Sequence, residues 1–257
     1  MTASARPRFQ HLFARSALLT AGMFLASLGI AMTTVADIGT TPISTVPYTA
    51  SAISGLTFGT CTILLNFFFV AGQILVLGRR WPVTNLIQLP VGCVFGFFID
   101  LSMHLLSGVH PANWPVALLL SVFGNFVLAL GVVMQIRSKT IVQPGEGFVI
   151  AVAARFRSSF GAMKISNDLT LAAVAAALGL CAVGHVIGIR EGTLVSAVMI
   201  GLFAKWIDRV ANRFTAPRAH EAAEPREVDL SARATPKAQP TTSDDAHGAR
   251  GQSGQEA

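Results

Sequence analysis

The feature that most constrains this chain is a series of long apolar stretches that carry almost no charge. Residues 16–36 contain no charged side chain, and a helix rising about 1.5 Å per residue can cross a hydrocarbon core about 30 Å thick over that length. The same pattern recurs and predicts six transmembrane helices, over residues 16–36, 61–78, 86–106, 115–136, 169–189 and 193–207. With 52% hydrophobic and only 12% charged residues, the composition excludes an ordinary soluble domain.

The first apolar stretch follows Arg6, Arg8 and Arg15, which imitates a secretory signal peptide. It is longer than the roughly 7 to 15 apolar residues of such a signal, so we expect it to remain as a span. The three cysteines, Cys61, Cys93 and Cys181, fall in predicted spans without a spacing typical of a metal site or a disulfide framework. They are interpreted as packing residues.

Basic residues beside the spans predict the orientation of the chain. If the chain has six spans and its N-terminus is cytoplasmic, Arg190 is the only basic residue beside the spans that lies on the outer side. Thirteen basic residues then lie on the cytoplasmic side: Arg6, Arg8, Arg15, Arg79, Arg80, Arg137, Lys139, Arg155, Arg157, Lys164, Lys205, Arg209 and Arg213. Positive charge concentrates on the cytoplasmic side of membrane proteins. We therefore predict two cytoplasmic termini, and we assign the basic pI to membrane insertion and not to nucleic-acid binding.

The composition predicts five consecutive segments. They are a cytoplasmic N-terminus over residues 1–15, a first three-span repeat over 16–106, an outer loop over 107–114, a second three-span repeat over 115–210, and a cytoplasmic tail over 211–257. The tail is rich in Ala, Pro, Glu and Ser and almost free of large apolar residues. It cannot bury enough apolar surface to fold, so we expect it to be disordered.

An internal match supports the division into two halves. A shift of 102 residues superposes residues 22–71 on 124–173 without gaps, with eleven identities in fifty positions. They are Gly22/Gly124, Phe24/Phe126, Leu28/Leu130, Gly29/Gly131, Met32/Met134, Pro42/Pro144, Ala52/Ala154, Phe58/Phe160, Gly59/Gly161, Ile63/Ile165 and Ala71/Ala173. A shift of 108 then pairs Leu86/Leu194, Phe95/Phe203, Ile99/Ile207 and Asp100/Asp208. Three spans per half predict an inverted-topology repeat, an architecture common among secondary transporters.

Each half is interrupted by a segment that is neither a span nor an ordinary polar loop. Residues 37–59 contain Pro42, and residues 137–161 contain Pro144. Because proline suits the first turn of a helix, each segment is predicted to open a short helix there. Such helices are too short to span, so they lie in the interface or re-enter the membrane. Re-entry from opposite faces would bring their N-termini together, where partial positive charge favours polar groups.

Candidate binding residues follow from these segments and from polar groups inside spans. Ser44 and Glu146 occupy equivalent positions after the prolines, and Gly145 lies beside Glu146. A polar residue inside a span is costly unless it is paired or faces a cavity. The candidate set is Pro42, Ser44, Asn66, Asp100, Pro144, Gly145, Glu146 and Asp168. For Glu146 the alternative is helix capping or surface solvation, and for Asp168 and Asn66 it is capping of the fifth and second spans.

Four short motifs resemble the YczE/YyaS/YitT-type bacterial membrane proteins. They are Gly39-Thr40-Thr41-Pro42, Gly55-Leu56-Thr57-Phe58-Gly59, Gln143-Pro144-Gly145-Glu146-Gly147-Phe148 and Arg190-Glu191-Gly192-Thr193. The similarity extends over roughly residues 15–210. It implies a location in the bacterial cytoplasmic membrane and no particular activity. Where members of that family carry an acid after the first-half proline, this chain has Ser44.

Two functions remain open from the sequence. The first is a secondary transporter or permease for an unknown small solute or ion, with its site between the two interrupted segments. The second is a non-transporting adaptor or regulator that acts through the cytoplasmic tail. We expect no enzyme, cofactor or metal site, because no catalytic constellation or metal-ligand cluster appears. The bilayer and a second copy of the chain are the expected partners.

Overall fold

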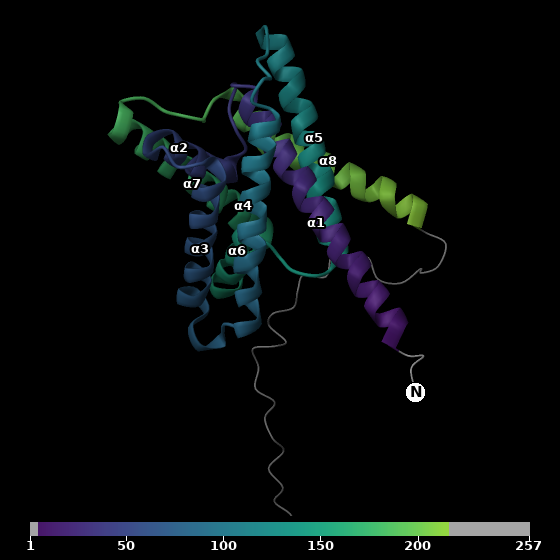
Figure 1. The fold of residues 1–257 in the computed structure, drawn as a ribbon. Coiled ribbons are helices and arrows are strands. Elements are labelled where there is room, and N and C mark those ends of the chain that lie inside the picture. The colour runs from purple at the N-terminus through teal and green to yellow at the C-terminus, as the bar shows by residue number, and fades with distance from the viewer. Residues whose placement is uncertain (1–4, 216–257) are drawn as a thin grey trace, which may run out of the picture. The chain divides into compact units, whose positions relative to one another are not determined.

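The computed structural model describes residues 5–215, and this part of the chain contains only helices (Figure 1). The α-helices are α1 (Ala5–Val35), α2 (Thr45–Ser54), α3 (Phe58–Leu77), α4 (Gln88–Leu105), α5 (Trp114–Ser138), α6 (Pro144–Phe156), α7 (Phe160–Val183) and α8 (Glu191–Thr215). Short 3-10 helices occupy Pro42–Ser44, Gly78–Arg80 and Val83–Ile87. The predicted all-α class is therefore confirmed for the described residues.

Within residues 5–215, five helical segments are long and apolar enough to cross a membrane, which makes this a multi-pass membrane protein. They are Phe13–Val35, Phe58–Arg80, Val83–Leu105, Trp114–Ser138 and Phe160–Val183. The predicted sixth span over 193–207 lies within α8, which is more polar because Glu191, Lys205 and Asp208 fall within it. A sixth crossing therefore stays a prediction.

The predicted boundaries of the fifth span were wrong. We placed it at 169–189, whereas α7 begins at Phe160 after the cap Ser159 and ends at Val183 before a left-handed Gly184. The uncharged stretch starts only after Asp168, but Lys164 and Asp168 both lie inside α7, where their side chains form an ion pair of 2.8 Å along one face of the helix. The predicted cap role of Asp168 was wrong for the same reason, since it lies inside α7.

Two further boundaries differ from the sequence prediction. Asn66 does not cap the second span, because α3 starts at Phe58 and its first turn is capped by the Thr57 hydroxyl, which accepts from the backbone N–H of Thr60 at 3.1 Å. The tail was expected from residue 211, but α8 continues to Thr215. The predicted disorder of 216–257 lies outside the described residues.

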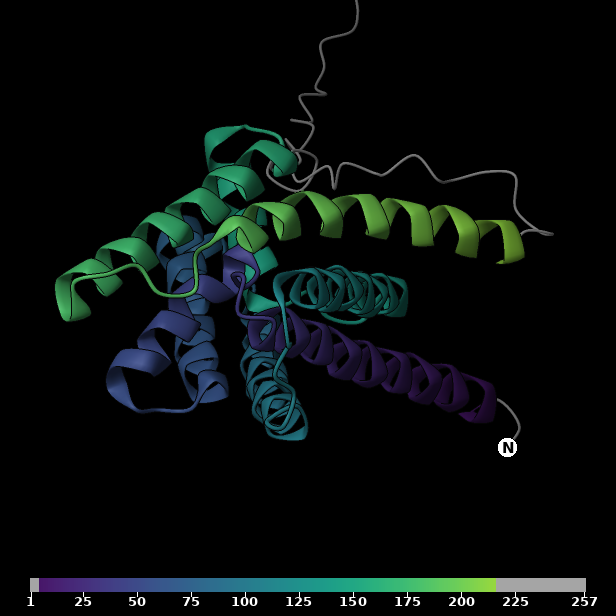
Figure 2. The same ribbon diagram turned by 90° about the horizontal axis from the view of Figure 1, so that it is seen from above.

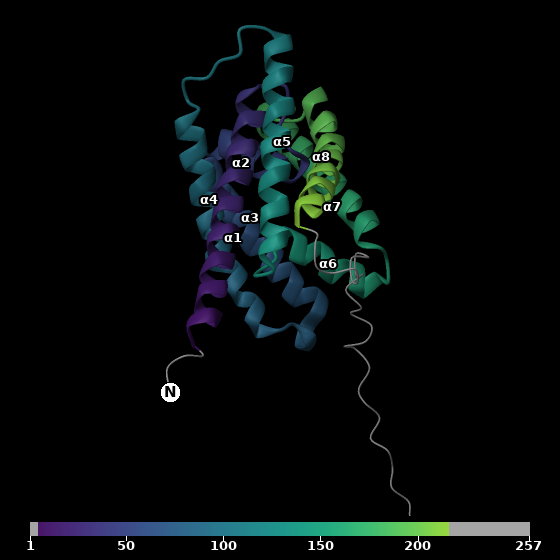
Figure 3. The ribbon, with the colours of Figure 1, turned by 90° about the vertical axis from the view of Figure 1, so that its right-hand side faces the viewer.

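Helices α1 and α5 make the most extensive helix–helix contact in the described bundle, and glycines make their close approach possible (Figure 3). A Cβ added at Gly22 would lie 2.8 Å from the carbonyl oxygen of Gly131, and one added at Gly29 would lie 2.6 Å from that of Gly124. Without glycine the two backbones could not approach so closely. Small residues serve this purpose in membrane helix packing, where lipid supplies no hydrophobic drive between helices.

The remaining helices pack around this pair. Helix α4 lies along α1 and α8 lies along α5, while α3 and α4 form a packed hairpin. Each short helix packs against a long helix of the other half of the chain, α2 against α7 and α6 against α3 (Figure 2). At the α3–α6 contact the Phe148 ring lies over Gly72 and 5.5 Å from the Phe69 ring centroid.

The α1–α5 contact gives a direct test. Gly29→Val should destabilise the protein by about 1–3 kcal/mol, because the added side chain overpacks a backbone contact that cannot yield. Gly201→Ala is the matched control, because nothing lies within 4 Å of a Cβ at that helical glycine, and alanine there should raise stability slightly. Thermal unfolding of the purified protein measures both; similar melting temperatures for the two variants would contradict the packing.

Candidate functional site

The two short helices begin beside one another. Pro42 and Pro144 each occupy the first helical turn after an extended residue, Thr41 and Gln143 respectively. The Cδ1 atom of Ile43 lies 2.9 Å from where a Cβ of Gly145 would be, so the turns 42–44 and 144–146 touch. We call them the paired turns. Short helices after the two prolines were predicted, and they are confirmed.

In the first of the paired turns the polar groups are satisfied within the chain. The Thr41 hydroxyl donates to Ser44 Oγ at 2.8 Å, and the Thr45 hydroxyl donates to the Pro42 carbonyl at 2.7 Å. The hydroxyls of Thr34 and Thr40 lie 2.8 Å apart. All of these side chains are buried, so this side of the site is a hydroxyl-lined, uncharged environment.

The second of the paired turns is attached to α3 and α4 through two amide side chains. Gln73 Nε2 donates to the Pro144 carbonyl at 3.1 Å and to Gln88 Oε1 at 2.9 Å. Both glutamines are buried, and a Cβ at Gly147 would lie within 3.0 Å of both amide nitrogens. The sequence analysis missed Gln73 and Gln88, although a glutamine inside an apolar stretch is itself a signal of a paired polar group.

Glu146 is the acid of the paired turns. It lies half-buried in the first turn of α6, a helix too short to span, where the helix dipole favours a negative charge. Burial raises the pKa of Glu146 above its ordinary value, and the charge of Lys164 on α7 lowers it in part. Lys164 also pairs with Asp168 at 2.8 Å. Glu146 is therefore placed to hold a proton at a pH where an exposed carboxyl would have lost it.

Asn66 and Asp100 were candidates for the same site, but their described contacts lie within the α3–α4 hairpin. The Asp100 carboxylate accepts from the backbone N–H of Gly59 and from the hydroxyl of Thr57, both at 2.6 Å. It thereby satisfies donors at the N-terminus of α3. The Asn66 side chain lies against Gly92, with Nδ2 3.1 Å from where a Cβ would be. Asp168 lies on α7 with Lys164.

A polar pocket that the sequence analysis missed lies beside the start of α2. Its volume is about 130 Å³, and its lining includes Thr34, Asp37, Tyr48, His185 and Arg190. The loop before α8 closes one side, because the Arg190 guanidinium donates to the Asp37 carbonyl at 2.7 Å. Burial, with the nearby charge of Asp37, raises the pKa of Tyr48, and Arg190 lowers it in part.

Backbone hydrogen bonds fix the loop before α8 against the first half of the chain. The N–H of Thr40 donates to the Gly188 carbonyl at 3.0 Å, and the N–H of Gly192 donates to the Ile38 carbonyl at 2.8 Å. Gly188 adopts φ +74° and leaves no room for a Cβ beside the Tyr48 ring. The paired turns hold neutral polar groups and the half-buried carboxyl of Glu146, and the described residues contain no group of three His, Cys, Asp or Glu side chains suited to a metal ion.

The contacts of Asp100 predict a structural role. Asp100→Ala should lower stability by about 1–3 kcal/mol, because it leaves the Gly59 N–H and the Thr57 hydroxyl without their acceptor. Asp37→Ala should cost less than about 1 kcal/mol, since Asp37 is exposed and lies 3.6 Å from Arg190. Chemical unfolding of the two variants compares them directly; a larger loss at Asp37 would contradict the assignment.

The pKa of Glu146 predicts a pH dependence of stability. Because its pKa is raised in the folded protein, the unfolded chain releases the proton first, and folding stability falls as pH rises from about 4.5 through the raised value. Glu146→Gln removes this loss. The melting temperature of the variant, relative to that of the unmodified protein, should therefore increase as pH rises over the same range. Glu191→Gln, at an exposed carboxyl, is the control and should show no such gain.

Comparison with known proteins places the chain in a family. No curated protein and no solved structure matches the chain significantly. A family model described as a family of unknown function (DUF6198) matches residues 13–209, which include all the described spans and both paired turns. The match covers well over half of the chain. The protein therefore belongs to this family of unknown function, DUF6198.

Proposed function

We propose that this protein is a secondary transporter or permease of the bacterial cytoplasmic membrane. Its substrate is a small polar solute or ion, and its site lies at the paired turns, between two inverted halves of three spans each. Both termini are cytoplasmic in this proposal, and the sixth crossing is made by α8. The relation to YczE/YyaS/YitT-type proteins, carried by the motifs around Pro42 and Pro144, belongs to the same proposal.

The observation that carries the proposal is a pair of reciprocal contacts between α1 and α5. Gly22 lies against Gly131, and Gly29 lies against Gly124. The shift of 102 residues converts each contact into the other, since Gly22 matches Gly124 and Gly29 matches Gly131. A two-fold axis requires such self-complementary pairs. Ile43 and Gly145, the touching residues of the paired turns, are also equivalent under this shift.

Helix directions support three crossings in each half. Ser27 on α1 lies 3.1 Å from Ser102 on α4, and Phe24 packs against Phe98, so α1 and α4 run in parallel. Helices α5 and α8 run in parallel too: the Asn125 amide donates to Ser196 Oγ at 3.0 Å near one end, and the contacts of Arg137 with Asp208 lie near the other. Since α8 follows α5 over this length, it is suited to the sixth crossing.

The α3–α4 hairpin and its proposed equivalent, α7–α8, differ in packing, and this difference favours a conformational change in the second half. Helices α3 and α4 are packed, and Asp100 closes the open end of their hairpin at Gly59. Helix α8 runs away from α7 (Figures 1 and 2), and nothing lies within 4 Å of a Cβ at Gly161, the equivalent of Gly59. In inverted-repeat transporters one repeat rocks or gates against the other around the site, which opens the site on alternate sides of the membrane.

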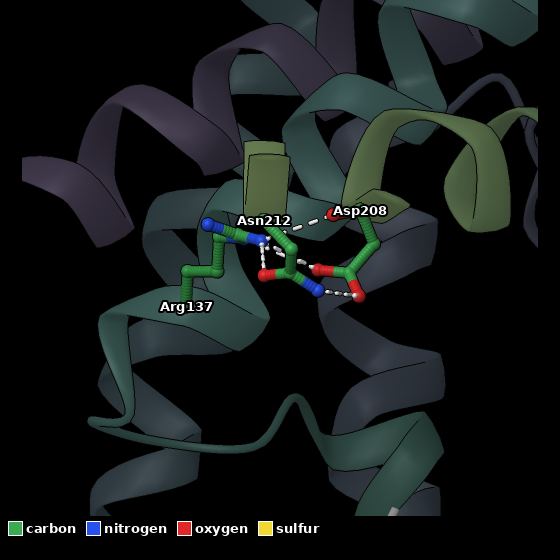
Figure 4. A network of polar contacts seen from close by, with 3 residues as sticks. All are labelled: Arg137, Asp208 and Asn212. Atoms are coloured by element: carbon green, nitrogen blue, oxygen red, sulfur yellow. Dashed lines mark hydrogen bonds and ion pairs between the residues drawn. The ribbon is translucent and has the colours of Figure 1, made fainter. Parts of the chain in front are cut away.

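The equivalent of Asp100 has a different partner. Asp208 accepts from Arg137 Nη2 at 2.9 Å and from Arg137 Nε at 3.2 Å, and Asn212 contacts both side chains (Figure 4). We propose that in the second state Asp208 leaves Arg137 and caps α7 at Ser159 and Gly161. Helices α7 and α8 then pack as α3 and α4 do here.

Transport is tested in proteoliposomes loaded with a broad panel of metabolites and ions, with and without a proton gradient. We expect uptake of at least one solute that is coupled to the gradient, and Glu146→Gln should remove this coupling. Glu191→Gln is the matched control, because this carboxyl is exposed, whereas Glu146 is half-buried in the paired turns. Removal of residues 216–257 should leave uptake intact, whereas an adaptor acting through its tail would lose a bound partner.

The second state is tested by cross-linking in a variant that lacks the three native cysteines. Gly161→Cys and Ala204→Cys, at the equivalents of Gly59 and Gly96, should form an intramolecular disulfide in part of the population. Arg137→Gln frees Asp208 and should raise the yield, while Asp208→Asn should lower it. A yield at background in all variants, or a disulfide only between two copies, would overturn the proposed closure without bearing on uptake.

A further inference from the structure

A cavity of about 490 Å³ lies between α5 and α8, outside the proposed transport site. It is lined by Phe126, Leu202, Phe203, Trp206 and Arg209. Four of these side chains are apolar, and the Arg209 guanidinium is the single charged group among them. The Phe126 ring meets Phe203 edge to face at 5.7 Å and lies 6.4 Å from Trp206. The cavity therefore combines an aromatic apolar wall with one cation.

The cation of this cavity has no protein partner among the residues that the structure describes. Asp208, next to Arg209 in sequence, is committed to Arg137 and Asn212 (Figure 4). Lys205, one turn before Arg209, makes no described ion pair either. Leu202, Lys205 and Arg209 are spaced by three and four residues, which places them on one face of the helix. Positive charge thus gathers at one end of an apolar groove.

We propose that this cavity binds an anionic phospholipid, with an acyl chain against Phe126, Leu202 and Phe203 and the headgroup phosphate at Arg209. The apolar wall excludes a polar solute, which would lose its hydration there without gaining hydrogen bonds. The unpaired cation distinguishes the groove from a surface that merely contacts bulk acyl chains. Tryptophan concentrates at the membrane interface, and basic pockets between helices bind acidic headgroups. This inference does not depend on transport.

The test uses Trp206 as a reporter in a variant with Trp81→Phe and Trp114→Phe. The protein is placed in phosphatidylcholine vesicles that contain increasing fractions of a lipid with brominated acyl chains, which quenches tryptophan on contact. Brominated phosphatidylglycerol should reach half-maximal quenching at about a five-fold lower fraction than brominated phosphatidylcholine. A basic side chain near the headgroups contributes about 1 kcal/mol, which corresponds to that ratio.

Variants assign this preference to one side chain. Arg209→Gln should make the two brominated lipids equivalent, and Arg209→Lys should retain most of the preference. Arg79→Gln is the matched control, because Arg79 is exposed and lies outside the cavity, so it should leave the preference unchanged. Equal quenching by both lipids in the unmodified background would overturn the proposal. So would a preference that survives Arg209→Gln, or quenching by neither lipid, which would indicate a second protein copy in the groove.

Discussion

The contact between α1 and α5 is the interaction on which the rest of this structure depends. In a bilayer, apolar helix surfaces gain little by leaving lipid, so helices associate where their backbones come close enough for dense van der Waals contact. Gly22, Gly29, Gly124 and Gly131 supply that approach: a Cβ at the first, second or fourth would overlap the opposite backbone, and one at Gly124 would lie 2.9 Å from Met32 Cβ. Helices α4 and α8 then lie along the outer sides of this pair.

Once α1 and α5 are fixed, the short helices have few places to lie. Each follows one of these helices directly and crosses to the other half, α2 to α7 and α6 to α3. In this arrangement the non-helical residues 38–41 before Pro42 are buried by protein, whereas Lys139 and Val142 before Pro144 are exposed. The buried polar groups are paired within the protein: Gln73 donates to the Pro144 carbonyl, and Thr41 donates to Ser44, because a buried polar group without a partner is costly.

Much of this arrangement could be predicted from the sequence. The prolines located the two short helices, because Pro42 and Pro144 have a strong local preference for a first helical turn. The fifth span was misplaced because only the uncharged stretch was counted, whereas α7 also includes Lys164 and Asp168, which neutralise each other one turn apart. The pairing of Gln73 with Pro144 joins residues far apart in the chain, so no local pattern contains it.

The capping of α3 by Asp100 was missed for the same reason, because a carboxylate in a span indicates a partner without identifying it. The pocket beside Tyr48 was missed as well. It depends on backbone contacts of the loop before α8, such as Thr40 with Gly188, and backbone hydrogen bonds of loops leave no signature in residue type. The sequence could predict the residues whose conformational preference, such as that of proline for a first helical turn, does not depend on tertiary contacts.

Equivalent residues with different partners carry the strongest argument for a mobile second half. Asp100 and Asp208 occupy matching positions, yet the first caps α3 and the second binds Arg137, whose own equivalent is Val35. The Arg137–Asp208 pair is partly exposed and is worth about 1 kcal/mol or less, while a helix cap is worth about 1 kcal/mol. The exchange of one contact for the other is therefore nearly balanced in energy. A difference of this size is within reach of a bound solute, since a ligand shifts an equilibrium by its differential affinity for the two states.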